Sequence, residues 1–171
     1  AICLMPTNLY GKGDNYHEKN SHVLPALLNR FHHHSMMQKE KISCWGTGAP
    51  RREFLHVNDL AEACIFALEY WNPDANNSPK DNEGNPLNIL NVGTGNDISI
   101  KDLANTIAEI TNFNGVIEWD TSKPDGTFQK LLNISKFRAL GWEPKINLLE
   151  GLKMTYEDFK EDLQRNRLRS K

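Results

Sequence analysis

The feature that most constrains the fold of this chain is an apolar run that ends at Pro6 and leads into a polar loop and an amphipathic helix. Residues 2–5 are apolar, as in a buried strand. Turn-forming residues fill positions 8–20, and Ser21 is placed to cap a helix that reaches Arg30. Open α/β sheets bind ligands at polar loops that leave the carboxyl ends of buried strands. The segment therefore predicts an α/β fold with a binding site at this loop.

The rest of the chain mixes strand and helix patterns. Asn58 or Asp59 is expected to cap its first helix, and residues 72–86 are expected to form a polar surface insertion. The regular strand–helix alternation of a complete doubly wound sheet is absent, which indicates a small α/β cap plus the last edge of a nucleotide-binding domain. Strands are predicted at 41–45, 53–57, 87–92 and 116–119, and helices at 60–71, 101–111, 135–140 and 148–163.

Composition excludes several functional classes. A net charge of −2 over 171 residues offers no electrostatic basis for binding nucleic acid or an anionic membrane, and the apolar runs are too short to span a bilayer. Cys3, Cys44 and Cys64 lie in apolar surroundings without paired spacing, so we expect reduced core cysteines in a cytoplasmic protein. Because Ala1 is not an initiator methionine and the first strand needs sheet partners, we expect the chain to be part of a longer protein.

Common cofactor and metal motifs are missing from the sequence. There is no G-x-G-x-x-G and no phosphate-binding P-loop, and the Gly-Thr-Gly segments at 46–48 and 93–95 have only the pattern of a turn. The three consecutive histidines at 32–34 would point in different directions from a helix, so they cannot share one metal ion. The candidate functional residues are therefore isolated donors on loops, namely Asn8, His22, Arg30, Trp45, Arg52, Lys123 and Asp125.

Each of these candidates has a functional and a plainer interpretation. Arg52 could clamp a phosphate with two nitrogens, or be a surface charge paired with Glu53. Trp45 could stack on a base or sugar, or belong to the core. His22 could exchange protons near neutral pH, or be structural. Asp125 lies in a Pro-Asp-Gly turn, where its carboxylate could accept bonds from sugar hydroxyls or a base edge.

Longer stretches resemble a known family. Asn-Leu-Tyr-Gly at 8–11, with Arg-Glu-Phe-Leu-His-Val-Asn-Asp-Leu-Ala-Glu-Ala at 52–63, resembles the extended short-chain dehydrogenase/reductase family, which acts on nucleotide sugars. Asn-Ser-His-Val at 20–23, Trp-Gly at 45–46 and Ser-Lys-Pro-Asp-Gly-Thr at 122–127 resemble the members that make GDP-L-fucose. The resemblance implies NADP-dependent 3,5-epimerisation and 4-keto reduction of GDP-4-keto-6-deoxy-D-mannose.

The order of these motifs implies that the chain is the C-terminal, substrate-binding portion of such an α/β enzyme, with the Rossmann core largely absent. On this interpretation residues 1–20 are the last strand and active-site loop of the NADP-binding domain. Residues 21–171 are the sugar-nucleotide binding region. The resemblance also implies a homodimer for the complete enzyme.

Site residues follow from the resemblance, position by position. His22 matches the epimerisation acid and would also approach the cofactor. Pro6, Thr7, Asn8 and Leu9 would border the nicotinamide end of NADP(H). The residues that would hold the GDP-sugar are Arg30, Trp45, Arg52 and Asp125, with Lys123 as a weaker candidate.

The chain departs from the family pattern in two respects. No cysteine stands at the family's catalytic position, and the only tyrosine followed four residues later by lysine is Tyr156, in a predicted helix outside the expected order. The resemblance therefore implies that this chain alone lacks hydride transfer. Two alternatives stay open: another nucleotide-sugar epimerase or dehydratase of the same superfamily, and a non-catalytic fragment that binds nucleotide sugars.

Overall fold

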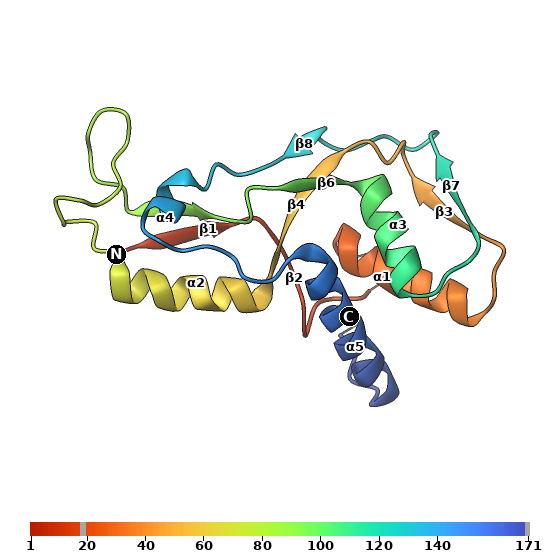
Figure 1. Cartoon of the computed structure of the whole chain (residues 1–171). Helices are drawn as coiled ribbons and strands as arrows, with labels where there is room; N and C mark the ends of the chain where they lie inside the picture. Colours follow the sequence, from red (N-terminus) through yellow and green to blue (C-terminus); the bar gives the residue numbers. More distant parts are fainter. Residues whose placement is uncertain (18–19, 170–171) are drawn as a thin grey trace.

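The computed structural model describes residues 1–17 and 20–169 of the chain. Figure 1 shows an elongated arrangement in which α2 lies below β1 and α5 lies below β4 and β6. The strands are β1 (Cys3–Pro6), β2 (Asn8–Tyr10), β3 (Lys41–Trp45), β4 (Arg51–His56), β5 (Ile89–Val92), β6 (Asp97–Ser99), β7 (Val116–Asp120) and β8 (Gln129–Lys130). The helices are α1 (Val23–Met36), α2 (Val57–Tyr70), α3 (Ile100–Ile110), α4 (Ser135–Ala139) and α5 (Leu148–Gln164).

Parallel pairing through helical crossovers dominates the described part of the chain. β1 pairs with β5, β2 with β4 and β3 with β7, each in parallel and each after a connection that contains a helix. Among the strands of the described residues, β6 alone runs antiparallel to its neighbour, β4, while β8 adds a short parallel pair to β4. Parallel strands joined by helices are typical of Rossmann-type α/β sheets.

This pairing corrects the expectation that Rossmann-type structure is largely absent from the chain. Leu4 pairs with Leu90 and Leu9 pairs with Leu55, so the strands at the start of the chain already have parallel partners within it. The apolar pattern of a single strand indicates that the strand exists, but it does not identify which distant segment of the chain pairs with it.

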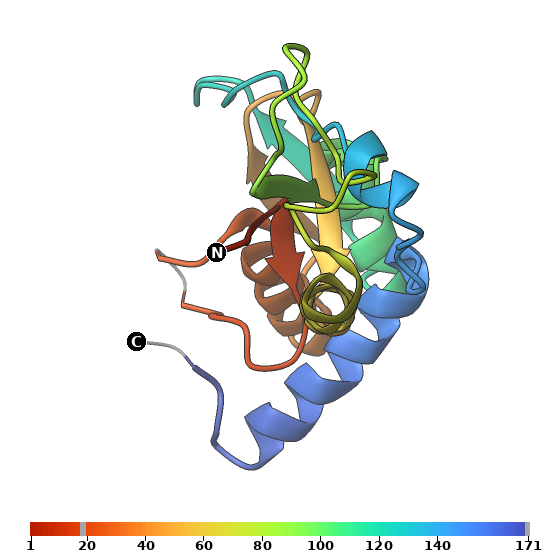
Figure 2. The ribbon, with the colours of Figure 1, turned by 90° about the vertical axis from the view of Figure 1, so that its left-hand side faces the viewer.

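β4 separates two hydrophobic clusters. Phe54 belongs to the cluster under α1, α3 and α5, and the next residue, Leu55, belongs to the cluster between α2, β5 and α4. Successive side chains of a strand point to opposite faces, which explains the division. Figure 2 shows α2 nearly end-on beneath β1, with α5 on the other side of it. β4 is therefore the strand from which side chains reach both halves of the core.

Two helix starts differ from the sequence-based prediction. His22, not Ser21, is the N-cap residue of α1, and its side chain makes no capping hydrogen bond. His56 is the N-cap residue of α2, where its Nδ1 accepts from the Asn58 N–H. β4 continues into α2 without a loop, so the cap of this helix lies earlier in the chain than expected. Asp59, one of the two expected caps, is a buried residue within the helix.

The surface also differs in part from expectation. Cys44 is buried, but Cys3 and Cys64 are exposed, so the prediction that all cysteines lie in the core is wrong for two of them. Most of residues 72–86 are exposed or half-buried turns, as predicted for a surface insertion. No helix within the described ranges is long and apolar enough to cross a membrane.

Candidate functional site

An open cleft of about 910 Å³ lies where the polar loop leaves the first strands. It is lined by the ends of β1 and β2, the start of α1, and parts of β4 and β8. The structure brings together here six of the residues predicted from sequence, which are Pro6, Thr7, Asn8, Leu9, His22 and Arg52. The cleft also contains Asp14, Lys130 and Leu132, which sequence reasoning did not select.

Two cations meet on neighbouring strands in this cleft. Arg52 on β4 is the register partner of Lys130 on β8. The Nη1 of Arg52 donates to the carbonyl oxygens of Thr127 and Arg51, both at 2.7 Å. Among residues 1–17 and 20–169, neither cation forms an ion pair. The plainer interpretation of Arg52 as a partner of Glu53 is therefore wrong, and two positive charges are left for an anion.

Glu53 is instead a buried acceptor for backbone amides. Its side chain is fully buried. Its Oε1 accepts from the N–H groups of Thr94 at 2.6 Å and Gly95 at 2.7 Å, and its Oε2 accepts from the N–H of Leu132 at 2.9 Å. Sequence reasoning missed this role. The sequence did contain a signal for this role. Glu53 lies within the strand pattern, directly before the apolar residues Phe54 and Leu55, where a carboxylate is expected to be buried and to need hydrogen-bond donors.

The backbone carbonyl of Glu53 reaches the opposite wall of the cleft. It accepts from Asn8 Nδ2 at 2.8 Å and from Thr7 Oγ1 at 3.2 Å. One residue thus connects the loop after β1, the turn after β5 and the segment after β8. Thr7 and Asn8 from the first of these segments, and Leu132 from the third, line the cleft.

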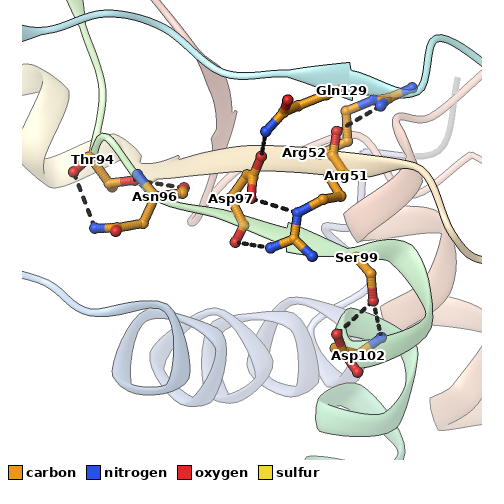
Figure 3. Close-up of polar contacts among 8 residues, drawn as sticks. All are labelled: Arg51, Arg52, Thr94, Asn96, Asp97, Ser99, Asp102 and Gln129. Carbon is orange, nitrogen blue, oxygen red and sulfur yellow. Dashed lines mark hydrogen bonds and ion pairs between the residues drawn. The ribbon is translucent and has the colours of Figure 1, made fainter.

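A second acidic residue holds β8 from its other end (Figure 3). Asp97 on β6 accepts from Arg51 Nε at 2.7 Å, and its backbone oxygen accepts from Arg51 Nη2 at 3.0 Å. Its other carboxylate oxygen accepts from the Gln129 side-chain amide. The bonds from Gln129 and Arg51 lower the pKa of the Asp97 carboxyl group. β4, β6 and β8 are therefore fastened together next to Lys130.

His22 lies at the mouth of the cleft with an exposed side chain. Asp14, on the same cleft, accepts from the Asn15 N–H through Oδ1 at 2.7 Å, while its buried Oδ2 has no protein partner among the described residues. Burial raises the pKa of the Asp14 carboxyl group, and the charges of His22 and Arg169 oppose that rise. An imidazole and a partly buried carboxyl group thus share one wall, which suits proton exchange.

Trp45 and Asp125 form a separate, exposed group. The exposed fraction of Trp45 is 74%, so its assignment to the core is wrong, and Lys123 Nζ lies 5.9 Å from the centre of its ring. Asp125 accepts from the N–H and Oγ1 of Thr47, at 2.9 and 2.6 Å, and these bonds lower its pKa. Neither residue lines the cleft. The loop that contains Asp125 is connected to the cleft by the hydrogen bond from Arg52 to the carbonyl oxygen of Thr127.

Arg30, a predicted site residue, and Tyr156, which matches the family pattern by spacing alone, both lie away from the cleft. The guanidinium of Arg30 donates to the carbonyl oxygen of Ser43 on β3, so Arg30 and His22 do not face one cavity. Tyr156, the only tyrosine with the right spacing to a lysine, bonds through its hydroxyl to His32 Nδ1 at 2.9 Å. Lys160 lies above the ring of Tyr156. This pair packs against α1 and has no access to the cleft.

Comparison with known proteins places residues 1–93 in a described family. They match the model of the NAD dependent epimerase/dehydratase family, and they make up more than half of the chain. This match overturns the expectation that the chain is only a C-terminal part from which the Rossmann core is missing. It coincides with the parallel pairs β1–β5 and β2–β4, so the Rossmann-like α/β portion of an extended short-chain dehydrogenase/reductase extends across residues 1–93.

Curated relatives are similar along nearly the whole chain. The chain is 46% identical to GDP-L-fucose synthase 1 of Arabidopsis thaliana over 157 residues, which is 92% of this chain and 45% of that protein. It is 46% identical to GDP-L-fucose synthase of Escherichia coli strain K12 over 164 residues, which is 96% of this chain and 50% of that protein. The chain spans about half the length of these relatives.

Solved structures share the fold. A GDP-L-fucose synthetase from Naegleria fowleri bound to NADP superposes with a TM-score of 0.82 at 26% identity, over 99% of this chain and 49% of that one. A GDP-6-OMe-4-keto-L-xylo-heptose reductase from C. jejuni has a TM-score of 0.82 at 34% identity, over 94% of this chain and 54% of that one.

Proposed function

Because the chain belongs to the NAD dependent epimerase/dehydratase family, we propose that it forms the GDP-sugar site of an NADP-dependent epimerase and reductase. The reaction proposed is 3,5-epimerisation and 4-keto reduction of GDP-4-keto-6-deoxy-D-mannose, which yields GDP-L-fucose. The similarity to GDP-L-fucose synthases from a plant and a bacterium supports this choice.

The observation that carries the proposal is the pair of cations in the cleft. Arg52 and Lys130 are register partners on β4 and β8, and neither is neutralised by a carboxylate among the described residues. A diphosphate offers several anionic oxygens that can accept from both side chains. The planar guanidinium of Arg52 can bind two of these oxygens at once, while Lys130 adds a point charge.

Trp45, Asp125 and Arg30 are proposed to contact the nucleoside end of the same ligand. The exposed ring of Trp45 is free to stack on a base or sugar. Asp125 is held next to it by Thr47 and lies in the loop that continues to Thr127, the hydrogen-bond partner of Arg52. A ligand whose diphosphate binds Arg52 would therefore extend toward this exposed group.

His22 is proposed to act as the acid of the epimerisation. The carbons that flank a 4-keto group lose protons readily, because the ketone stabilises the resulting enolate, and a side chain of moderate pKa then suffices to return a proton. His22 is exposed at the cleft and makes no capping bond, so its ring nitrogens are available to a substrate. Asp14 lines the same cleft.

The residues present fit one end of NADP(H). The side chains of Thr7 and Asn8 are turned toward the Glu53 carbonyl, which leaves the strand ends at Pro6 and Leu9 as a wall of the cleft. The ends of parallel strands are where α/β sheets bind ligands, which suits the nicotinamide end, and the sequence contains no glycine-rich loop for the cofactor's phosphates. When bound, NADPH supplies the hydride for the reduction, while these residues orient the ring and exclude water.

Calorimetric titration of this chain with GDP, UDP and dTDP tests the proposal. We expect GDP to bind most tightly. Arg52→Ala and Lys130→Ala should each weaken GDP binding by roughly tenfold, because each removes a charge-assisted contact. Lys101→Ala, an exposed lysine on α3, is the matched control and should bind as the unaltered chain does. Equal binding of the three nucleotides would favour another nucleotide-sugar epimerase or dehydratase, and no binding by a folded chain would contradict the proposal.

The catalytic assignment needs an enzyme that contains this chain and shows the activity. His22→Gln should abolish epimerisation at C3 and C5 while GDP affinity changes by less than about twofold, because the imidazole contributes proton transfer more than binding. Normal epimerisation in this variant would exclude His22 as the acid.

A further inference from the structure

We propose that Glu53 is a positioning residue for the anion site: its buried carboxylate holds the backbone segments that place Arg52 and Lys130 side by side. The inference rests on the proposed function, because the ligand it concerns is the diphosphate of a nucleotide. Glu53 does not line the cleft and would not touch that ligand.

The two oxygens of Glu53 divide their tasks. Oε1 accepts from Thr94 and Gly95, so it fixes the turn after β5, and Oε2 accepts from Leu132, so it fixes the segment after β8. The backbone of Gly93 also packs closely against the carboxylate, since a Cβ at this position would overlap Oε1. Three donors aim at one side chain that no solvent reaches.

Lys130 lies between two anchored residues. Gln129, just before it, bonds to the Asp97 carboxylate, and Leu132, two residues after it, bonds to Glu53. Arg52 precedes Glu53 on β4 and pairs in register with Lys130. Two like charges on adjacent strands repel each other, so without an anion the backbone on either side of Lys130 must be fixed to keep the two side chains together. Asp97 fixes it before Lys130, and the buried Glu53 fixes it after Lys130.

Glutamine cannot reproduce this arrangement. Its amide has one oxygen and one NH₂ group, so if the oxygen accepts from Thr94 and Gly95, the NH₂ group faces the N–H of Leu132. Two donors would then oppose each other in a buried site, and the segment after β8 would move away. The variant Glu53→Gln therefore releases Lys130 selectively while it keeps the size of the side chain.

The chain offers a matched control in Asp59. This carboxylate is also buried, with 2% exposure, and it also accepts from backbone amides, those of Lys145 at 3.1 Å and Ile146 at 3.0 Å. The segment it holds does not line the cleft that contains Lys130. Asp59→Asn thus repeats the chemical change at a segment that lines a neighbouring cavity with Arg52 but does not line the cleft with Lys130.

The test compares binding of GDP with binding of GMP to Glu53→Gln, Asp59→Asn and the unaltered chain. A ligand with two phosphates depends on both cations, whereas GMP lacks the second phosphate. We expect Glu53→Gln to weaken GDP binding by roughly tenfold or more and GMP binding by much less, so that the preference for GDP collapses. Asp59→Asn should leave the preference unchanged. In an Arg52→Ala, Lys130→Ala background, Glu53→Gln should have little further effect.

Several outcomes would overturn the inference. If Glu53 had a merely structural role, the binding of GDP and of GMP would weaken in parallel in Glu53→Gln. An effect on GDP binding equal to that of Asp59→Asn would likewise contradict the inference. If Glu53→Gln does not fold, Glu53→Asp keeps the charge but is too short for Leu132, and the same loss of preference is expected. Amide hydrogen exchange separates this inference from the proposed function: exchange at Leu132 should accelerate in the Glu53 variant even if the unaltered chain binds no GDP, and unchanged protection there would refute the anchor.

Discussion

The cleft side of the proposed site and the 121–128 loop are held by different means. On the cleft side, the fully buried Glu53 accepts from the backbone of two segments. The 121–128 loop is exposed along its whole length, and the exposed pair of Thr47 and Asp125 fastens it. A buried carboxylate that loses its amide donors, or amides that lose their acceptor, cannot turn to water, whereas an exposed pair can. On the proposed function, buried bonds hold the residues expected to bind the phosphates, and the residues expected to bind the nucleoside lie on an exposed surface.

This contrast matches what each part of a nucleotide requires. A diphosphate is bound by charges at fixed positions. When those charges are already in place before the ligand arrives, the cost of binding is smaller. Aromatic stacking by Trp45 tolerates some displacement, because an exposed ring keeps its contact area when the loop shifts. The variants below test the contrast, from the largest expected effect to the smallest.

Glu53→Ala should have the largest effect on stability. It leaves the N–H groups of Thr94, Gly95 and Leu132 without an acceptor in a buried site. We expect the free energy of unfolding to fall by about 3 kcal/mol or more, measured by urea denaturation. Glu118→Ala removes an exposed carboxylate paired with Lys41 and should cost less than about 0.5 kcal/mol. Equal losses for the two variants would remove the distinction between the regions.

Gly46→Ala should disturb the loop side, with Gly13→Ala as its control. Both glycines have positive φ angles, 76° for Gly46 and 77° for Gly13, so alanine at either should cost roughly 1–2 kcal/mol through backbone strain. Only at Gly46 would the added Cβ overlap the Asp125 carboxylate, while the space at Gly13 is open. The amide resonance of Thr47 should therefore shift in Gly46→Ala and stay in place in Gly13→Ala. An unshifted resonance in both would mean that the loop does not depend on this contact.

His56 should make the core side sensitive to acid. Burial lowers the pKa of His56 below its usual value of 6.5, so the unfolded chain binds the proton more readily than the folded one. Stability should therefore be complete above pH 6.5 and decrease as the pH falls below it, as protonation also ends the acceptance of the Asn58 N–H by Nδ1. Unfolding measured from pH 7 to 5 should show a weaker dependence in His56→Asn, which keeps a capping oxygen. The same slope in both would assign the dependence to other groups.

Thr47→Val should have the smallest effect. It removes the hydroxyl that donates to Asp125 Oδ2 at 2.6 Å, on an exposed surface, so the unfolding free energy should change by less than about 0.5 kcal/mol. The pKa of Asp125 should nevertheless rise, because the Thr47 side chain is the main cause of its lowered value. Titration of the carboxyl carbon resonance measures this change, and Thr106→Val, at an exposed helix position, serves as the control.

Much of the fold could be predicted from local sequence. The strand at Lys41–Trp45 agrees with its predicted range, and the helix at Leu148–Gln164 agrees to within one residue. His22, Arg52 and the strand end at Pro6 line one cleft, and their roles there stay predictions. The agreement of the strand and the helix depends on short-range rules, because apolar periodicity and turn residues act within a few positions.

The corrections that bear on the site concern contacts between distant segments. The sequence pattern did not reveal that Leu4 pairs with Leu90, so the extent of the Rossmann-like portion was underestimated. Arg30 has the spacing to share a face with His22, yet its guanidinium bonds to Ser43 on a strand that follows the helix. Spacing along one helix does not state which neighbouring element lies beside it.

The sequence by itself determined the elements of this protein, the polar loop after the first strand and the family to which its motifs belong. Only the tertiary structure decided that Lys130 stands beside Arg52 and that Glu53 is an anchor and not an ion-pair partner. The physical reason is that a carboxylate takes its role from the donors around it. For Glu53 those donors are backbone amides from two segments far along the chain, and a backbone amide carries no mark in the sequence.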